Sequence, residues 1–514
     1  MKPLLAAGLL FMALCAPPAL SANPATLYDT HCQACHGPGR MGAMAPALLP
    51  QSLERLRPAE VESVIRNGRP ATQMAGFAGT LSDEDIRALA GYLAVPPSSL
   101  PDWSAADMAA SYRVLVDPAR LPPRPVHSAN PQNLFVVVEA GDHHVTVLDG
   151  DRFRPVARFA SHFALHGGPK FSPDGRFVYF ASRDGWATQY DLYSLQVVAD
   201  VRVGLNTRNL AVSSDGRWVL VGNTLPETLV LLDANGLRPV RTLPVRDREG
   251  RVSRVSAVYD APPRKSFVVA LKDVPELWEI SYDPAAEPIY PGYVHDYKMG
   301  EGIAVPGYLN PRVTPLELVL DDFFFDPSYR HVIGASREGR AQVINLDIRR
   351  KVAELSLSGM PHLGSGITFV RDGRRYMATP NLKGGLLTVV DMESWQTVKD
   401  IVLPGAGFFL RSHENTPYAW ADAMMSPRKD TLALIDKRTL EVARTLTLRP
   451  GKTNAHVEFT RDGRYALVSI METPGELVVV DATTLREVAA LPMMKPIGKY
   501  NVFNKVTRSE GTSH

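Results

Sequence analysis

The feature that most constrains this chain of 514 residues is a turn motif that recurs from about Asn133 onward. Each clear copy carries Asp-Gly-Arg, then alternating apolar residues, and about ten residues later a second β-rich run that ends near an Asp. Asp-Gly turns between alternating runs are typical of β-hairpins. The clearest copies lie at 172–176, 214–217, 371–374 and 461–464. This part of the chain is therefore expected to consist of repeated antiparallel hairpins.

The spacing of the copies indicates how the hairpins are grouped. Weaker copies start at 130–133, 261–264, 326–329 and 413–416, so the period is about 45 residues. Such a period is typical of four-stranded propeller blades. Eight copies predict a mainly β fold with an eight-bladed β-propeller over residues 132–514, and seven blades are the main alternative. The tail 499–504 can supply the strand that closes the ring.

Two of the three cysteines stand in a pattern that indicates a cofactor. Cys32 and Cys35 are followed directly by His36. In a Cys-x-x-Cys-His run, two thiols on one helical turn reach the vinyl groups of a haem and the imidazole reaches the iron. A disulfide between the two cysteines is the alternative interpretation. The pattern predicts one covalently attached haem c with His36 as an iron ligand.

The region 23–95 has the size of a single-haem, all-α class I cytochrome c domain. Ser82 can cap a helix whose first turn is acidic, which suits the positive end of the helix dipole. An apolar stripe for the haem follows at helical spacing. It consists of Ile86, Leu89, Ala90 and Leu93.

The haem iron needs a sixth ligand. Met74 lies in a loop just before the last helix of this domain, and we expect it to bind the iron. Met41 and Met44 are alternatives, but they lie too close to Cys35 to reach the opposite haem face easily. Histidine–methionine ligation raises the reduction potential, which suits an electron relay.

Residues 1–22 are typical of a signal peptide, with Lys2 before an apolar run too short to span a bilayer. Lipidation at Cys15 is the alternative. We expect export to the periplasm and no membrane span in the mature chain. The Pro-rich segment 96–131 is predicted to be a linker. The net charge of +2 gives no reason to expect a nucleic-acid partner.

Three histidines are expected at equivalent places in the propeller. His166, His362 and His456 each stand just before the predicted first strand of a blade, with glycines beside the first two. Equivalent loops of a propeller open onto the same mouth, so the three imidazoles can converge there. Glycine next to such residues lets a flat ligand approach the backbone.

Several stretches resemble the cytochrome cd1 nitrite reductase family over nearly the whole mature chain. The stretches that carry the resemblance are 111–116, the segment around His166, 182–184, Thr207-Arg208, Pro361-His362 and 498–504. The resemblance implies an eight-bladed propeller that binds haem d1. It also implies that His166 is the proximal ligand of the d1 iron and that His362 matches one of two distal histidines. Which of the two binds the iron stays open.

The chain departs from the reductases at two positions. Asp321 stands where the reductase family has its other distal histidine, and His456 stands where that family has none. The pattern is similar to that of the dihydro-haem d1 dehydrogenases. The resemblance therefore implies a periplasmic oxidoreductase that converts a propionate of dihydro-haem d1 to the acrylate of haem d1, with the electrons passing to haem c.

Roles for individual residues follow from this reaction. His456 is expected to take a proton, because an imidazole titrates close to working pH, and Tyr500 to orient the propionate or relay the proton. Arg183, Arg208 and Arg411 are expected to bind carboxylates of the tetrapyrrole, because guanidinium groups pair with carboxylates in bidentate geometry. Lys272 is a looser candidate.

The partners expected on this basis are dihydro-haem d1, an external electron acceptor, and cytochrome cd1 nitrite reductase as recipient of haem d1. Three alternatives remain at this point. The chain could be a nitrite reductase, a non-catalytic carrier that delivers haem d1, or an electron-transfer cytochrome fused to a scaffolding propeller.

Overall fold

The computed structural model describes residues 23–508 except 44, 54–55, 69–73, 99–101, 291–303, 337 and 358. The side chains of Gln51, His166 and Gly167 are also outside the description. The predicted signal peptide 1–22 and the alternative ligand Met44 therefore lie outside the described residues.

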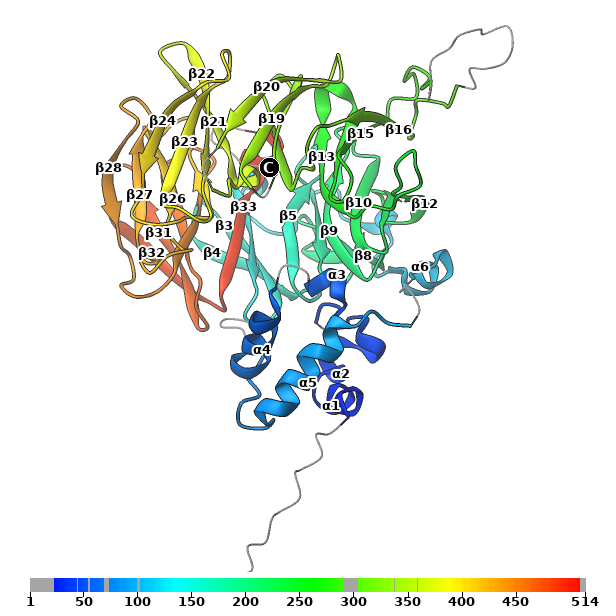
Figure 1. Ribbon diagram of the computed structural model, residues 1–514. Helices are drawn as coiled ribbons and strands as arrows, with labels where there is room; N and C mark the ends of the chain where they lie inside the picture. Colours follow the sequence, from blue (N-terminus) through cyan, green and yellow to red (C-terminus); the bar gives the residue numbers. More distant parts are fainter. Residues whose placement is uncertain are drawn as a thin grey trace, which may run out of the picture.

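The N-terminal region is all-helical (Figure 1). Helix α5 packs against both α1 and α4. The helices enclose a small apolar core that includes Tyr28, Ile86 and Leu89. The elements are α1 (Pro24–His31), α2 (Gln33–His36), η1 (Pro38–Arg40), α3 (Pro50–Leu53), α4 (Pro58–Asn67) and α5 (Asp83–Ala94).

Helix α5 has the start and the buried face that its sequence predicts. The Ser82 hydroxyl accepts a hydrogen bond from the backbone N–H of Asp85, and the Asp85 carboxylate accepts one from the N–H of Ser82. Ile86, Leu89 and Leu93 are buried. At the other end of the helix, the buried Arg40 guanidinium donates to the Tyr92 and Val95 carbonyls at 2.8 and 3.0 Å.

The predicted linker 96–131 contains short elements that pack on the propeller. They are α6 (Ala105–Ser111), β1 (Arg113–Val114), η2 (Pro118–Arg120) and the start of η3 (Pro131–Asn133). Strand β1 pairs antiparallel with β8 of the second blade, and the Arg113 guanidinium donates to both carboxylate oxygens of Asp200 at 2.8 and 2.6 Å. The segment is thus fastened to the edge of that blade.

The remaining strands of the described residues form eight antiparallel sheets, as the eight sequence copies predict. From the innermost strand outward, the first three are β33-β2-β3-β4, β5-β6-β7-β8-β1 and β9-β10-β11-β12. Their bounds are β33 (Pro496–Asn501), β2 (Leu134–Glu139), β3 (His144–Asp149), β4 (Arg154–Ala160), β5 (Leu165–Phe171), β6 (Phe177–Ser182), β7 (Trp186–Asp191), β8 (Gln196–Arg202), β9 (Asn206–Val212), β10 (Trp218–Leu225), β11 (Thr228–Asp233) and β12 (Pro239–Pro244).

The other five sheets follow in chain order, each with its first strand innermost. Their strands are β13 (Val255–Ala261), β14 (Ser266–Leu271), β15 (Glu276–Ser281) and β16 (Pro311–Pro315); β17 (Asp322–Phe325), β18 (His331–Ala335), β19 (Arg340–Asn345) and β20 (Arg350–Ser356); β21 (Ile367–Arg371), β22 (Arg374–Pro380), β23 (Leu386–Asp391) and β24 (Thr397–Val402); β25 (Leu410–Arg411), β26 (Tyr418–Asp422), β27 (Leu432–Asp436) and β28 (Glu441–Leu446); β29 (Asn454–Phe459), β30 (Tyr465–Ile470), β31 (Gly475–Asp481) and β32 (Glu487–Met493).

The ring is closed by the C-terminal strand, as predicted. Strand β33 pairs antiparallel with β2 and becomes the innermost strand of the first blade. Because the two ends of the propeller share one sheet, backbone hydrogen bonds between β33 and β2 hold the ring closed. Helix α7 (Val502–Thr507) follows directly.

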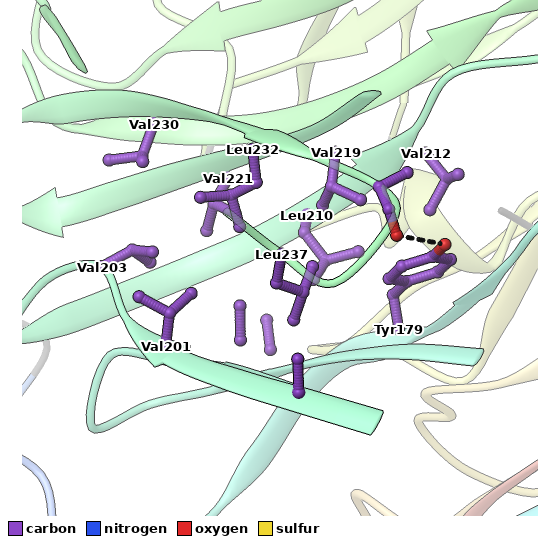
Figure 2. Packing of buried hydrophobic residues seen from close by; sticks show 14 of the residues in the cluster. Tyr179, Val201, Val203, Leu210, Val212, Val219, Val221, Val230, Leu232 and Leu237 are labelled. Carbon is purple, nitrogen blue, oxygen red and sulfur yellow. Dashed lines mark hydrogen bonds between the residues drawn. The ribbon is translucent and has the colours of Figure 1, made fainter. Parts of the chain in front are cut away.

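Buried side chains between the blades hold neighbouring sheets together. Figure 2 shows one such cluster, in which valines and leucines of β8 to β11 interdigitate. The Tyr179 hydroxyl donates to the Ala234 carbonyl at 3.0 Å within this cluster, so its buried polar atom is satisfied (Figure 2). The inner strands therefore carry apolar residues on both faces, because each face packs against a neighbouring blade.

The helical domain lies against one face of the propeller, and α7 lies at the other end of the central channel (Figure 1). The contact is apolar, because Ala47 and Leu49 pack with Leu205 and Leu225. Leu205 directly precedes β9, and Leu225 is the last residue of β10. The amide of Asn206 reaches the Ser52 hydroxyl at 3.4 Å. The channel mouth formed by the starts of the innermost strands therefore faces the helical domain.

Candidate functional site

The helical domain presents Cys32, Cys35 and His36 on one short segment. Cys32 caps α1, and α2 carries Cys35 and His36. Both thiols are free. The Nδ1 of His36 lies 2.8 Å from the Pro46 carbonyl, so it carries the proton and leaves the Nε2 lone pair for a metal. Burial lowers the pKa of His36, which favours the neutral, metal-binding form.

These residues fit a covalently attached haem. Two free thiols, one imidazole with a fixed tautomer, and an apolar wall that includes Cys32, Ile86 and Leu89 are what such a group needs. Met74 belongs to the loop before α5. A Cβ on Gly68, whose φ is +71°, would lie 2.4 Å from the Met74 carbonyl oxygen, so glycine lets this loop pass close to α4. The role of Met74 as sixth ligand stays a prediction.

In the propeller, the predicted histidines lie on innermost strands or just before one. His362 precedes β21, as predicted, but His166 lies inside β5 and His456 inside β29. The expectation that all three precede a strand was wrong for these two, because both strands start earlier and then bulge. The ladder of β5 shifts after His166, and that of β29 shifts between Ala455 and Glu458, with a φ of +48° at His456. A bulge re-aims a side chain, and at His456 the imidazole lies against the Tyr500 ring.

A continuous row of aromatic rings connects two of these positions to Tyr500. The His362 ring lies 4.0 Å from that of Phe408, and Phe408 lies 4.7 Å from Phe409. The Phe409 ring lies 4.5 Å from His456, and His456 lies 5.3 Å from Tyr500. These distances join ring centroids. The row brings together loops of the sixth and seventh blades with strands of the eighth and first.

The backbone of β5 packs against the Tyr500 ring at the end of this row. A Cβ on Gly168, whose φ is +68°, would lie 3.1 to 3.3 Å from ring atoms and the hydroxyl of Tyr500. Gly168 stands two residues after His166, so the β5 backbone next to this histidine touches the Tyr500 ring. The loops of all three predicted histidines therefore converge on one channel, although the His166 side chain lies outside the described residues.

His456 is neutral in this setting, and the expectation that its pKa lies close to working pH was wrong, because the imidazole is buried beside cations. Burial and then the positive charges of Lys499 and Arg411 lower the pKa of His456 well below its usual value. The Lys499 ammonium lies 3.4 Å from the His456 Nδ1 and also donates to the His456 carbonyl and, at 2.8 Å, to the Ser469 hydroxyl. Burial raises the pKa of Tyr500 to about 12, so its hydroxyl keeps its proton at neutral pH.

The predicted carboxylate-binding arginines lie in different environments. Arg411 is buried in β25 and forms an ion pair with Glu458, which is itself buried. The Arg208 side chain is half-buried, and its Nε donates to the Ser256 carbonyl at 2.5 Å. Arg183 stands in the turn between β6 and β7, where its backbone N–H donates to the Ala164 carbonyl, next to the start of β5. Their roles toward a ligand stay predictions.

Asp321 forms an ion pair. Its carboxylate lies 3.1 Å from the Lys272 ammonium, and Lys272 is largely buried. The Asp321 carbonyl accepts from the Ser256 hydroxyl at 2.5 Å, which ties this residue to the neighbouring blade. A carboxylate with such a partner is held in its ionised form.

Several residues of this channel were not predicted from the sequence. Phe408 and Phe409 are the middle members of the ring row. The buried Asp422 holds their loop, because its carboxylate accepts hydrogen bonds from both backbone N–H groups at 2.8 and 3.1 Å. Lys499 is fully buried beside His456. Only the position of Lys499 next to Tyr500 in the closing strand could have pointed to it; the Asp422 contact depends on the fold.

The chain matches two protein-family models. The Cytochrome D1 heme domain model matches residues 129–294 and 307–505, which are most of the chain. The model of the cbb3-type cytochrome c oxidase subunit III matches residues 19–93. The two matches therefore cover the propeller and the helical domain separately.

Individual proteins align with the chain over most of its length. Dihydro-heme d1 dehydrogenase of Pseudomonas aeruginosa is 57% identical over 511 residues, 99% of both chains. A nitrite reductase of Stutzerimonas stutzeri is 25% identical, with 93% of this chain and 92% of that protein aligned. Protein NirF of Pseudomonas aeruginosa is 27% identical over 71% of this chain and 90% of its own.

A solved structure agrees with these alignments. The structure of dihydro-heme d1 dehydrogenase NirN in complex with DHE superposes with a TM-score of 0.84 at 57% identity, covering 94% of this chain and all of that one. Among the described residues, no helix is long and apolar enough to cross a membrane. From its eight sheets, its Cys-x-x-Cys-His segment and these matches, the chain belongs to the Cytochrome D1 heme domain family, together with dihydro-heme d1 dehydrogenase.

Proposed function

We propose that this protein is a dihydro-haem d1 dehydrogenase, an oxidoreductase that converts one propionate of dihydro-haem d1 to the acrylate of haem d1. The 57% identity with a protein of that activity over the whole chain supports this function. The reaction breaks two C–H bonds and forms one C=C bond, so two protons and two electrons must leave the substrate.

The observation that carries the proposal is the contact of His456 with Tyr500 inside the channel. The rings are 5.3 Å apart, and His456 is only 6% exposed. A neutral imidazole that faces a protonated phenol can accept a proton from a bound propionate side chain while the phenol orients its carboxylate. A low pKa of His456 means that the proton is passed on soon after it is taken.

The substrate is expected to lie on the ring row, with its iron near His166 or His362. The His362 Nδ1 lies 2.8 Å from the Phe408 carbonyl and carries the proton, which leaves Nε2 for a metal. Arg183, Arg208 and Arg411 are kept as candidates to bind the substrate carboxylates. Arg411 acts there together with Glu458, its buried partner.

Cys32 and Cys35 would hold haem c, and His36 and Met74 are the residues that would bind its iron. When bound, this haem supplies a one-electron acceptor for the electrons that leave the substrate. The channel mouth lined by His362 faces the domain that holds these residues, and the apolar contact of Leu49 with Leu205 fixes that domain in place.

Asp321 argues against nitrite reduction as the main activity. A distal proton donor has to carry a proton at working pH, whereas Asp321 is paired with Lys272 at 3.1 Å. The position that resembles a distal histidine in the reductases therefore carries an ionised carboxylate. We place the protein in the periplasm, where an external acceptor removes the electrons and cytochrome cd1 nitrite reductase receives haem d1.

The proposal is tested by mixing dihydro-haem d1 with at least a twofold molar excess of the purified protein in the absence of oxygen, with haem c oxidised, because each substrate releases two electrons and each haem c accepts one. We expect the absorption spectrum of haem d1 to appear while haem c is reduced. A carrier would transfer dihydro-haem d1 to the reductase without any spectral conversion. Nitrite reduction at rates clearly above those of free haem d1 would identify a reductase instead.

A further inference from the structure

The channel has a second end, which the reaction proposed above does not use. A cavity of about 460 Å³ lies there, lined by residues at the ends of β5, β9, β13 and β17 and by α7. Thr507 and Arg508 on its rim are exposed, so the cavity reaches solvent on the face away from the helical domain.

Ionisable side chains connect this cavity with the His456–Tyr500 pair. Lys505 is a lining residue of the cavity, and its ammonium lies 5.3 Å from the centre of the Tyr500 ring. Lys170 also lines the cavity, on β5. The Arg411–Glu458 pair lies beside both Tyr500 and Lys505 and acts electrostatically on each.

Lys505 stands among other cations, and helix α7 holds it there. The Asn504 amide donates to Glu458 at 3.1 Å and ties α7 to β29, which keeps Lys505 at the channel. Burial lowers the pKa of Lys505 well below its usual value and that of Lys170 to about 8. The groups that face Lys505 from the packed strands are Lys170, Arg411, Glu458 and Tyr500. A lysine in such a setting exists partly as a neutral amine.

We propose that Lys505, which lies over the face of the Tyr500 ring, relays the substrate protons across bridging water from the Tyr500 hydroxyl to the cavity at the far end of the propeller channel. The inference rests on the proposed dehydrogenase function. A tetrapyrrole on the ring row would stand between His456 and the mouth that faces the helical domain, so the far end is the open way to solvent. Lys505 does not touch the substrate in this scheme and acts through Tyr500.

The relay conserves protons. When two C–H bonds break and the C=C bond forms, the two electrons pass to haem c and then to an external one-electron acceptor. The two protons pass in turn through His456 and Tyr500. For each one, the Lys505 amine takes the proton that Tyr500 hands on, and the resulting ammonium releases a proton to cavity water. Tyr500 and Lys505 then return to their starting protonation states.

The test measures single turnover and steady-state turnover in Lys505→Met. We expect both rates to fall at least about 10-fold, because the protonated Tyr500 and the weakly basic His456 cannot hold the two protons that one turnover releases. A pH-indicator dye in weakly buffered solution should show proton release that lags behind haem c reduction. Lys399→Met is the matched control, since Lys399 lies on the outer strand β24 and pairs with Glu441. It should behave as the unaltered protein.

Lys505→Arg separates a relay from a charge. Arginine keeps the positive charge but stays protonated, so turnover should remain slow. Restored turnover in Lys505→Arg or normal turnover in Lys505→Met would each overturn the relay. Substrate binding, followed by spectral titration, reports whether Lys505→Met is folded. If Lys505→Met is not folded, Lys170→Met tests the same route from the cavity side. We expect proton release to lag behind haem c reduction in this variant too. An unchanged steady-state rate would contradict the relay. No conversion by the unaltered protein would instead refute the dehydrogenase function itself.

Discussion

In the helical domain, the residues that fit a haem stand together at positions 32–36, whereas in the propeller the site is assembled from distant parts of the chain. His362, His456 and Tyr500 come from three blades and meet only because innermost strands converge on one channel. The two sites also differ in charge. The first is apolar apart from its ligands, and the second holds the buried Lys499 and a buried Arg–Glu pair.

This difference indicates a division of labour. An apolar pocket around a covalently bound group suits electron transfer, which needs little rearrangement of charge. A channel with several buried ionisable groups suits proton transfer, which needs groups whose pKa values are shifted from their usual range. The account therefore assigns electrons to one region and protons to the other, and each of the following changes tests that assignment.

The largest effect is expected for the double variant Cys32→Ala/Cys35→Ala. Without thiols the domain cannot hold a covalent haem, so conversion coupled to haem c reduction should be lost. Because the propeller has its own cores, it should still fold and bind dihydro-haem d1. Haem staining on denaturing gels and spectral titration with substrate measure the two properties. Covalent haem in the double variant would show that these cysteines are not the attachment site.

His456→Asn tests the proton side with the electron side intact. Asparagine tolerates the positive φ of +48° better than most residues, so the bulge should be kept. We expect turnover to fall by about 10²-fold or more, with haem c content and substrate affinity unchanged. Single-turnover spectroscopy measures the rate, and an unchanged rate would remove His456 from the mechanism.

Tyr500→Phe removes only a hydroxyl. The ring should still pack against Gly168 and His456, so the fold should be kept. We expect a smaller loss of turnover than in His456→Asn, of about 10- to 100-fold. The solvent isotope effect in D₂O should also change, because one proton-transfer step is lost. If rate and isotope effect both match the unaltered protein, Tyr500 is only a packing residue.

Leu49→Ala tests the contact between the two regions. Truncation of this buried side chain removes apolar contact with Leu205, at a cost of about 2–5 kcal/mol. We expect slower reduction of haem c by bound substrate, measured by stopped-flow absorption, with normal haem content. Leu205→Met, which keeps the volume, is the control and should show little change. Equal rates in both variants would show that docking does not govern electron transfer.

The smallest effect concerns the pH dependence of stability. Burial raises the pKa of Asp422 to about 6, above the usual carboxyl value of 3.8, so the folded protein binds a proton more readily than the unfolded chain. This group's contribution to stability therefore increases as pH falls from about 6 to 4. Asp422→Asn should flatten the pH dependence of the denaturation midpoint in that window. An identical pH profile in the variant would contradict the assignment.

How far the sequence predicts this molecule depends on how local the information is. The Asp-Gly hairpins, the closing strand and helix α5 follow from short patterns, because turn chemistry and capping act within a few residues. His362, His456 and Tyr500 could be named from resemblance. The bulges that place His166 and His456 inside strands, the Asp422-held loop of Phe408 and Phe409, and the buried Lys499 depend on neighbouring blades, so no local pattern reports them.

The central claim is that bond breaking in the propeller and reduction in the helical domain are one coupled event. Dihydro-haem d1 carrying deuterium on the carbons of the reacting propionate, mixed with the oxidised protein in a stopped-flow instrument, tests it most directly. The account predicts that haem d1 formation and haem c reduction slow down together. Deuterium that delays neither event, or product that forms while haem c stays oxidised, would contradict it.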